Sequence, residues 1–395
     1  MDYTEAIDTE GVAAVPPSSR VKVLHVGKFY PPQMGGIETH LEALCGELKK
    51  SLSVRVIVAS DNAHGSEEVL RGIPVSRLPT PLSLASTPLC PRMMGEIRRA
   101  NADIIHLHLP NPMAILAYLA SGHRGHLVVT YHSDTVRQKA LGALFEPLLH
   151  LALRRSAAII ATSPDYQRTS IVLQRYSDRC HVIPYGIALR QFEHCDASEV
   201  QKIRAQYGER LVISVGRLVY YKGFEYLIQA MREVNGKLLI AGEGPLRRKL
   251  QELANHLGVT DKVVFLGEIQ NRDVIPYYHA ADLFALASVA RSEAFGIVQI
   301  EAMAAGLPIV NTKLDSGVPF VSPHRETGLT VPPRDAPALA RAVNHLLDNP
   351  RLRQSLGGAG RLRAQQEFSV TTMAARTLEL YSSVMKRSDR RPPRS

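Results

Sequence analysis

The chain has 395 residues, of which 45% are hydrophobic and 21% are charged, which suits a globular protein with two domains of ordinary size. Its net charge of +10 favours anionic partners such as nucleotide phosphates, nucleic acid or an acidic lipid surface. No apolar run approaches the ~20 residues of a membrane-spanning helix, and the four scattered cysteines argue against structural zinc and a disulfide framework.

The two ends of the chain differ in charge. Residues 1–20 are acidic and lack the basic and apolar regions of a secretion signal, so we expect a disordered leader. The cysteine usage fits a reducing cytoplasm, with peripheral attachment to the inner face of the cell membrane left open. Aromatic residues are few and not interleaved with basic ones, which argues against a nucleic-acid groove. Basic residues crowd the C-terminal tail: Lys386, Arg387, Arg390, Arg391 and Arg394.

Short apolar runs alternate with helical patterns in the first half of the chain. A helix is expected over Ile37–Lys50, where apolar residues recur at helical spacing. Strand–helix alternation predicts a parallel sheet covered by helices on both faces. The expected strands are Val21–Val26, Val54–Ala59, Ile104–His108, Leu127–Tyr131 and Ala158–Thr162.

The same alternation restarts in the second half. The expected strands there are Leu211–Val215, Lys237–Ala241, Val263–Leu266, Leu283–Ala287 and Pro308–Asn311. The expected helices lie near Phe224–Val234, Pro245–Leu257 and Pro337–Leu347. Two doubly wound α/β domains facing each other place a ligand in the cleft at their strand ends.

We therefore divide the chain into residues 21–190 and 191–368, followed by a final segment, residues 369–395. The hinge is placed at Ile183–Gly186 and the polar Asp196–Gly208 region that follows it. A last helix over Val370–Met385 has no evident place in the second sheet, so we expect it to cross back to the first domain.

Two carboxylates eight positions apart, Glu293 and Glu301, mark the most informative stretch. Helical spacing begins at Phe295-Gly296, so Glu293 lies in the loop ahead of a helix and Glu301 about one turn inside it. The free N–H groups of a helix start attract anions. Carboxylates beside such a start suit a ligand with sugar hydroxyls and phosphate, such as a nucleotide sugar. A capped helix with a solvated Glu301 stays an equal alternative for the pair alone.

The first strand of each expected domain is followed by a candidate ligand loop. Gly35-Gly36 precedes a helix, and paired glycines let a backbone approach a ligand closely, although they also suit a plain turn. Arg217 and Lys222 follow the first strand of the second half. A guanidinium and an ammonium there can clamp a diphosphate and offset the charge of a leaving group; solvated surface cations are the alternative.

Histidines supply a further candidate. His132 follows an expected strand end, but no serine elbow or cysteine nucleophile accompanies it, so triad chemistry is not expected. His106 and His108 alternate on one strand face without a ligand-spaced partner, so no metal is expected. The segment Val136–Arg155 mixes apolar and basic residues, which fits either a packed helix or a helix lying on an acidic membrane.

Together these motifs resemble the bacterial retaining glycosyltransferases of family 4, which have the GT-B architecture. The resemblance runs from about Val21 to Met385. It rests on Gly35-Gly36-Ile37-Glu38-Thr39-His40, His132-Ser133-Asp134, Arg217…Lys222-Gly223, Gly242-Glu243-Gly244-Pro245 and Glu293…Glu301. Residues 131–139 and 311–319 are most similar to transferases that assemble surface polysaccharides on lipid carriers, among them mannosyl- and rhamnosyltransferases that use GDP-activated sugars.

The resemblance implies a role for each matched donor-side residue. Arg217 and Lys222 would hold the donor diphosphate, and Glu301 would bond the ribose hydroxyls. Glu293, with the backbone of Phe295–Gly296, would contact the sugar. The implied partners are a nucleotide-sugar donor, a GDP-sugar foremost, and a lipid-linked or saccharide acceptor.

The resemblance also assigns the acceptor side. The Gly35–Gly36 loop would lie against the diphosphate and the acceptor, and His132 would approach the transferred sugar. Asp134 and Arg137 are candidates for acceptor contacts. No metal and no cofactor are implied.

The implied reaction is transfer of a hexose, of mannose or rhamnose type, in polysaccharide, O-antigen or exopolysaccharide biosynthesis. Retention usually suggests a covalent carboxylate intermediate. The family resemblance implies front-face attack instead, with the leaving phosphate accepting the proton. A sugar-nucleotide epimerase of GT-B fold and a non-catalytic nucleotide-sugar-binding protein are the alternatives.

Overall fold

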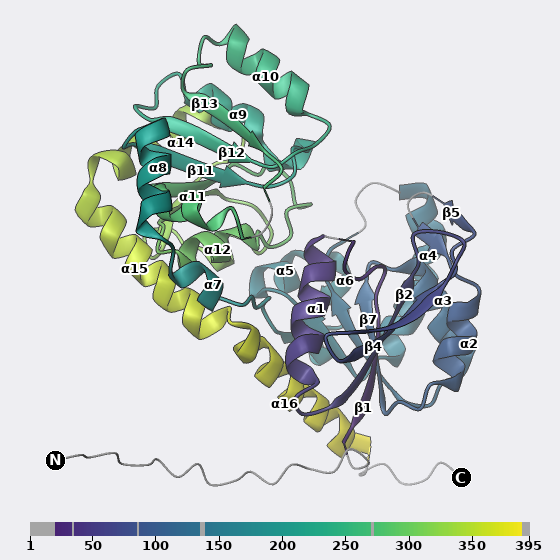
Figure 1. Cartoon of the computed structure of the whole chain (residues 1–395). Helices are drawn as coiled ribbons and strands as arrows, with labels where there is room; N and C mark the ends of the chain where they lie inside the picture. The colour runs from purple at the N-terminus through teal and green to yellow at the C-terminus, as the bar shows by residue number, and fades with distance from the viewer. Residues whose placement is uncertain (1–19, 34, 85–86, 135–138, 270–271, 389–395) are drawn as a thin grey trace, which may run out of the picture.

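Figure 1 shows a computed structural model, which describes residues 20–33, 35–84, 87–134, 139–269 and 272–388. The expected leader falls almost entirely outside these residues, as do Arg137 and the end of the basic tail. The chain forms two α/β halves, each built on its own sheet, with a pair of long helices running from the second half to the first (Figure 1).

The N-terminal sheet has eight strands in the described part of the chain, in the order β10-β9-β8-β7-β1-β2-β4-β3. All neighbours pair in parallel except β3 and β4. The strands are β1 (Lys22–Val26), β2 (Ser53–Ala59), β3 (Ser66–Leu70), β4 (Ile73–Leu78), β7 (Ile104–Leu109), β8 (His126–Tyr131), β9 (Ala158–Ala161) and β10 (Cys180–Val182). A separate hairpin is formed by β5 (Leu82–Leu84) and β6 (Thr87–Leu89).

Helices cover both faces of this sheet. One face packs on α1 (Gly36–Leu48), and the other on α2 (Arg92–Arg99), α3 (Pro112–Ser121) and α4 (Lys139–Arg155). Short helical segments follow at α5 (Pro164–Thr169), α6 (Ile171–Gln174) and η2 (Ser177–Arg179). The last turns of α4 bury Ala152 and Leu153 in the core, so this part of Val136–Arg155, for which a packed helix and a membrane-surface helix were both open, is packed. Among the described residues, no helix has the length and apolar character to cross a bilayer.

The C-terminal sheet is fully parallel, in the order β13-β12-β11-β14-β15-β16. Its strands are β11 (Leu211–Val215), β12 (Lys237–Ala241), β13 (Val263–Gly267), β14 (Leu283–Leu286), β15 (Ile309–Thr312) and β16 (Gly328–Val331). Its helices are α8 (Ala197–Tyr207), η3 (Tyr220–Lys222), α9 (Phe224–Ala230), α10 (Arg247–His256), α11 (Ile275–Ala280), α12 (Val298–Ala304), α13 (Val318–Val321), α14 (Ala336–Asp348) and α15 (Pro350–Glu367). In both sheets the strand order reverses beside the first strand, which confirms the expected pair of doubly wound domains.

The chain passes between the two halves twice, and the two passages are hydrogen-bonded to each other. The Ile187 N–H donates to the Phe368 carbonyl at 2.9 Å, and the Val370 N–H donates to the Ile187 carbonyl at 3.0 Å. A Cβ on Gly186 would lie 2.3 Å from the Ser369 carbonyl oxygen, so the close approach needs glycine. The short helix α7 (Arg190–Glu193) follows.

The segment Asp196–Gly208, expected next to the hinge because it is polar, instead forms α8, which packs on α11 of the C-terminal domain. Asp196 caps this helix by accepting a hydrogen bond from the Ser198 N–H at 2.8 Å. The segment is polar because most of the helix surface faces solvent.

The last helix, α16 (Val370–Ser388), crosses back to the N-terminal domain, which confirms the expectation (Figure 1). It lies beside α1 and completes the core on that face of the sheet. The buried side chains that it contributes are Met373, Ala374, Leu380, Tyr381 and Val384, which join Val23, Leu41 and Leu44 of the N-terminal domain.

Truncating a buried side chain of α16 should therefore destabilise the N-terminal domain. We expect Leu380→Ala to lower the unfolding free energy of that domain by about 2–5 kcal/mol, because it removes buried apolar surface and leaves a cavity. Urea unfolding followed by circular dichroism measures the change. Glu379→Ala, at the exposed neighbouring position, is the control; equal stability of the two variants would contradict the packing of α16.

Candidate active site

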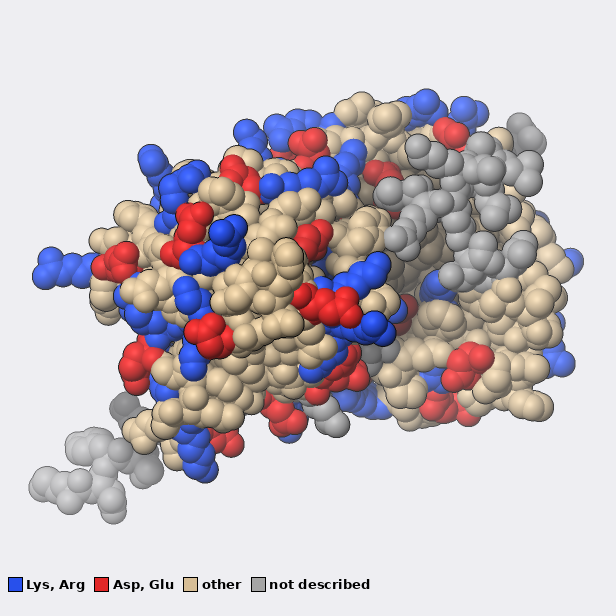
Figure 2. Space-filling model, turned by 90° about the horizontal axis from the view of Figure 1, so that it is seen from above, with Lys and Arg blue, Asp and Glu red and all other residues tan. Residues whose placement is uncertain are grey.

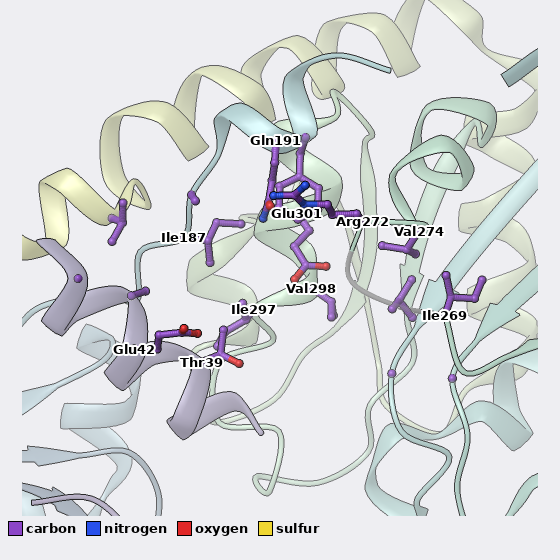
Figure 3. A pocket seen from close by; sticks show the side chains of 18 of the residues that line it. Thr39, Glu42, Ile187, Gln191, Ile269, Arg272, Val274, Ile297, Val298 and Glu301 are labelled. Atoms are coloured by element: carbon purple, nitrogen blue, oxygen red, sulfur yellow. The ribbon is translucent and has the colours of Figure 1, made fainter. Parts of the chain in front are cut away.

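A cavity of about 970 Å³ lies between the two domains. Thr39 and Glu42 project into it from α1 on one side, and Ile269 and Val274 line the opposite side (Figure 3). Glu301 of α12 points into the space between them (Figure 3). Both domains therefore contribute to one ligand-sized space, lined by the carboxyl ends of β11 and β12 on one side and by α1 and the β3–β4 turn on the other.

Glycines form part of the cavity wall at the carboxyl ends of β11 and β12. Gly216 has φ 149° and Gly242 has φ 139°, backbone conformations that other residues rarely adopt. A Cβ on Gly242 would lie 2.2 Å from the Gly216 carbonyl oxygen, and one on Gly244 would lie 2.5 Å from that of Leu218. Close packing thus excludes side chains here and exposes backbone to a ligand.

The two predicted cations at the end of β11, Arg217 and Lys222, differ in exposure and in their partners. The Arg217 side chain is exposed at the cavity and has no hydrogen-bond or ion-pair partner among the described residues. Lys222, in contrast, is almost buried and lies over Gly216, where a Cβ would approach its Nζ to 3.3 Å. Arg217 is therefore free to meet a ligand anion, while Lys222 is fixed by the protein.

Glu293 holds Lys222 in place. The Lys222 Nζ lies 2.7 Å from Glu293 Oε2, and the two side chains are 11% and 10% exposed. Ser288 Oγ donates to the same carboxylate oxygen at 3.2 Å. Burial alone would lower the pKa of Lys222, but the charge and hydrogen bond of Glu293 outweigh it and raise the pKa above its usual value. The ammonium is therefore charged at neutral pH.

Glu301 lies within α12 and Glu293 in the turn ahead of it, as expected, although the helix starts only at Val298. Gly296, with φ 78°, turns the chain into the helix. Tyr278 Oη donates to Glu301 Oε2 at 2.8 Å, and Oε1 has no hydrogen-bond partner among the described residues. Burial raises the pKa of Glu301, which the Tyr278 hydrogen bond and the charge of Lys222 oppose.

Across the cleft, the Gly35–Gly36 loop faces residues 293–297 ahead of α12, which we call the donor-side loop. A Cβ on Gly36 would lie 3.8 Å from the side chain of Ile297, which directly precedes α12. Gly35 has an extended backbone, so its φ does not require glycine; a Cβ there would instead meet the Glu38 carboxylate at 2.4 Å. The Phe295 side chain is buried in the core, which leaves its backbone for a ligand.

His132 is buried and does not line the cavity. Its Nδ1 is hydrogen-bonded to the Tyr185 hydroxyl, and its Nε2 lies 3.1 Å from His108 Nδ1. Both ring nitrogens are therefore engaged by the protein. Of the predicted site residues, Arg217 and Glu301 line the cavity.

Asp134 connects the two domains. Its Oδ1 accepts hydrogen bonds from the Tyr131 hydroxyl at 3.0 Å and the Ser170 hydroxyl at 2.9 Å. Its Oδ2 lies 3.3 Å from Nη2 of Arg291, two residues before Glu293. Arg291 also donates to the Thr169 carbonyl at 3.2 Å. Arg291 was not predicted as a site residue, because nothing in the sequence separates it from a solvated surface arginine.

Among the described residues, five histidines are buried in the N-terminal domain: His25, His40, His106, His108 and His132. Burial lowers the pKa of His25 and His40 to about 3, and the pKa values of the other three lie well below the usual range for the same reason. All five are therefore neutral at pH 7.

These histidines also form the groups that could hold a metal ion in the described part of the chain. One consists of His25, His106 and His108, and the other of His40, His108 and His132, with ligand atoms within 4.8 Å of one another. In the second group, His108 and His132 already direct their facing nitrogens at each other. A metal there would have to replace this hydrogen bond. The sequence did not reveal either group because His25 and His40 come from other elements.

Known proteins share this architecture along nearly the whole chain. Residues 34–191 match the family model described as Glycosyltransferase Family 4, and residues 197–363 match that of Glycosyl transferases group 1. The D-rhamnosyltransferase WbpZ of Pseudomonas aeruginosa is 32% identical, over 88% of this chain and 92% of that protein. The chain belongs to the family 4 glycosyltransferases. This glycosyltransferase is thus an enzyme, as the motifs predicted.

Two further proteins are similar to this glycosyltransferase. A GDP-mannose-dependent alpha-(1-6)-phosphatidylinositol monomannoside mannosyltransferase of Mycolicibacterium smegmatis is 31% identical over 91% of this chain and 98% of that protein. The structure of Anabaena Alr3699/HepE in complex with UDP superposes with a TM-score of 0.78, at 23% identity over 92% of this chain and all of that chain. The structural likeness confirms the expected GT-B fold.

The buried histidines predict that stability falls with acidity. Their pKa values are lower in the folded state than the ~6.5 of an unfolded chain, so below pH 6.5 unfolding takes up protons and stability decreases. The raised pKa values of Glu38 and Glu301 act in the opposite direction, but two carboxyls oppose five imidazoles. We expect a clearly lower melting temperature at pH 5.5 than at pH 7.5.

Thermal unfolding between pH 5 and 8 measures this dependence. A variant that lacks one buried imidazole, His40→Gln, should show a shallower dependence on pH than the exposed-site control His64→Gln. Equal stability of the unaltered enzyme at both ends of the range would contradict the neutral, buried state of the cluster.

Proposed function

We propose that this glycosyltransferase moves a hexose of mannose or rhamnose type, with retention, from a GDP-activated donor to a lipid-linked or saccharide acceptor in polysaccharide assembly. The observation that carries the proposal is the buried Lys222–Glu293 pair over Gly216, beside the unpaired Arg217. Together they place the Arg217 guanidinium at a cavity with a glycine wall and the Lys222 ammonium, paired with Glu293, directly beside Gly216. A diphosphate is the anion that such a cradle fits best.

The donor-side roles follow from the contacts of each residue. Arg217 and Lys222 bind the diphosphate, and Glu301 offers Oε1 to the ribose hydroxyls while Tyr278 holds Oε2. The backbone of Phe295–Gly296, at the turn into α12, contacts the sugar. These assignments agree with the roles implied by the family resemblance.

The same contacts favour front-face transfer. Glu293 is neutralised by Lys222 at 2.7 Å and hydrogen-bonded by Ser288, which makes it a weak nucleophile for a covalent intermediate. In front-face transfer the acceptor oxygen attacks the anomeric carbon, the bond to the diphosphate breaks, and the leaving phosphate takes the acceptor proton. Lys222 and Arg217 stabilise the charge that develops on that phosphate, so the proposed reaction uses no metal.

The base would occupy the end of the cavity beyond β13, lined by Glu268, Ile269 and Arg272. Guanine presents adjacent N–H donors on one edge, and the carboxylate of Glu268 is a matching acceptor. The relative named as GDP-mannose-dependent supports this choice, whereas the UDP complex of the structural neighbour shows that other members of the fold bind uracil nucleotides.

For the acceptor we retain Asp134 and Arg137 as candidates, with Arg291 beside them. A lipid-linked acceptor would bring the enzyme to the inner face of the cell membrane, where exposed Arg154 and Arg155 at the end of α4 meet acidic headgroups. On the face seen in Figure 2, basic and acidic side chains are interspersed rather than gathered into one patch.

Removing either cation should slow transfer. Arg217→Ala is expected to lower kcat about 10²-fold, or ~3 kcal/mol, without changing the melting temperature, because its side chain is exposed. Lys222→Ala should lower kcat similarly and also destabilise the fold, because Glu293 would be buried without its partner. Steady-state kinetics and thermal unfolding measure both effects. Arg248→Ala, at an exposed site on α10, is the control, and near-normal turnover in both cleft variants would overturn the proposal.

A donor panel tests the choice of nucleotide and reaction. GDP-, UDP-, ADP- and dTDP-sugars are compared for thermal stabilisation and for slow hydrolysis without acceptor. We expect the greatest stabilisation from a GDP-hexose, about 2.7 kcal/mol at 100 times its Kd, and little with Arg217→Ala. A larger effect of a UDP-sugar would contradict the guanine assignment. Formation of an isomerised nucleotide sugar would instead indicate the epimerase. Binding of the donor without any hydrolysis or transfer would indicate a non-catalytic protein.

A further inference from the structure

A row of hydrogen-bonded rings runs from the interdomain linker into the N-terminal sheet. The Tyr185 hydroxyl is bonded to His132 Nδ1, His132 Nε2 lies 3.1 Å from His108 Nδ1, and His108 Nε2 lies 3.0 Å from His25 Nδ1. All four side chains are buried, with at most 5% of any residue exposed. We call Tyr185, His132, His108 and His25 the imidazole row.

Parallel strand pairing builds this row. His25 of β1 lies opposite His106 of β7, and His108 is two residues further along the same face of β7. His132 follows the end of β8, the next strand. Toward the other strand ends this face is apolar, with Val23 and Ile104 in the core that α1 and α16 cover. The imidazoles therefore lie at the cleft-side end of a sheet face whose other end is apolar core.

The direction of the hydrogen bonds follows from the hydroxyl. Burial raises the pKa of Tyr185, so its O–H keeps its proton and donates to His132 Nδ1. The neutral His132 then carries its hydrogen on Nε2 and donates to His108, which donates in turn to His25. In the opposite direction two buried groups would lack partners among the described residues, the Tyr185 hydroxyl hydrogen and the His25 Nε2 lone pair, whereas this direction leaves only the His25 Nε2–H unpaired.

The far end of the row does not lead to solvent. His25 Nε2 is buried and has no hydrogen-bond partner among the described residues. The row therefore cannot pass protons through the domain. Its hydrogen bonds instead fix the orientation of the four rings. At the near end, the Tyr185 ring packs edge-on against Phe295, with ring centroids 4.9 Å apart, so that the row touches the loop that carries Glu293.

We propose that Tyr185 and His108 are positioning residues for sugar transfer. Their hydrogen bonds fix the orientation and the Nε2–H tautomer of the His132 ring. The contact of Tyr185 with Phe295 sets the position of this ring relative to the donor-side loop. The proposal rests on the proposed function, in which the backbone of Phe295–Gly296 contacts the transferred sugar, but the state of the His132 ring can be measured without any substrate.

The first test is spectroscopic. Protein labelled with ¹⁵N-histidine reports the protonation of each ring nitrogen through two-bond ¹H–¹⁵N correlations, and His132→Gln identifies the His132 signals by their loss. We expect a single Nε2–H tautomer for His132 between pH 6 and 8, unchanged by EDTA. Tyr185→Phe, which removes only the hydroxyl, should give a mixture of tautomers. An Nδ1–H tautomer in the unaltered enzyme, or signals that change when EDTA removes a bound metal, would overturn the proposal.

The second test separates positioning from stability. Tyr381→Phe is the matched control, because its hydroxyl bonds His106 Nδ1 at 2.6 Å in the same core but outside the row. Tyr185→Phe should lower kcat about tenfold with the donor KM little changed, whereas Tyr381→Phe should leave kcat and the His132 tautomer unaltered. Equal kinetics and equal His132 spectra for the two variants would overturn the proposal. Failure of the proposed function would appear separately, as near-normal turnover of Arg217→Ala.

Discussion

Parallel pairing of the strands is the constraint on which the cleft depends. It brings every strand of the C-terminal sheet to the same edge with its carboxyl end, so Gly216, which lies against Lys222 in the loop after β11, meets Gly242 at the end of β12. The N-terminal sheet does the same for His108 and His132. The cavity lies between the strand ends of the C-terminal sheet and α1 of the N-terminal domain, so neither domain could form it alone.

Charge within this space is arranged in two ways. The Lys222–Glu293 pair is nearly buried, and a pair removed from water loses much of the hydration of both charges. The loss is offset by the short contact and by the Ser288 hydroxyl. Arg217 remains hydrated and unpaired. An anion entering the cavity therefore meets the unpaired Arg217 and the backbone of Gly216, beside which the Lys222–Glu293 pair is fixed.

Sequence patterns predicted those parts of the fold that bury continuous apolar runs. The five expected strands of each half were found, but β3, β4, β5, β6, β10 and β16 were missed. β3 is a charged, exposed edge strand, β4 is interrupted by proline and polar residues, and the other four have only three or four residues each. Glu293, Glu301 and Lys222 were recognised from local motifs. The imidazole row and the Asp134–Arg291 pair could not be, because they join residues that are 24 to 157 positions apart and carry no local pattern.

The return of α16 to the first domain has a consequence for synthesis. The face of the N-terminal sheet that carries the imidazole row is closed by Met373, Leu380 and Tyr381, near the end of the chain. While the ribosome is still making the protein, this first-made domain therefore lacks part of its core. The C-terminal sheet, which ends with β16, can be completed earlier. The domain that emerges first can consequently complete its core only after α16 has been made.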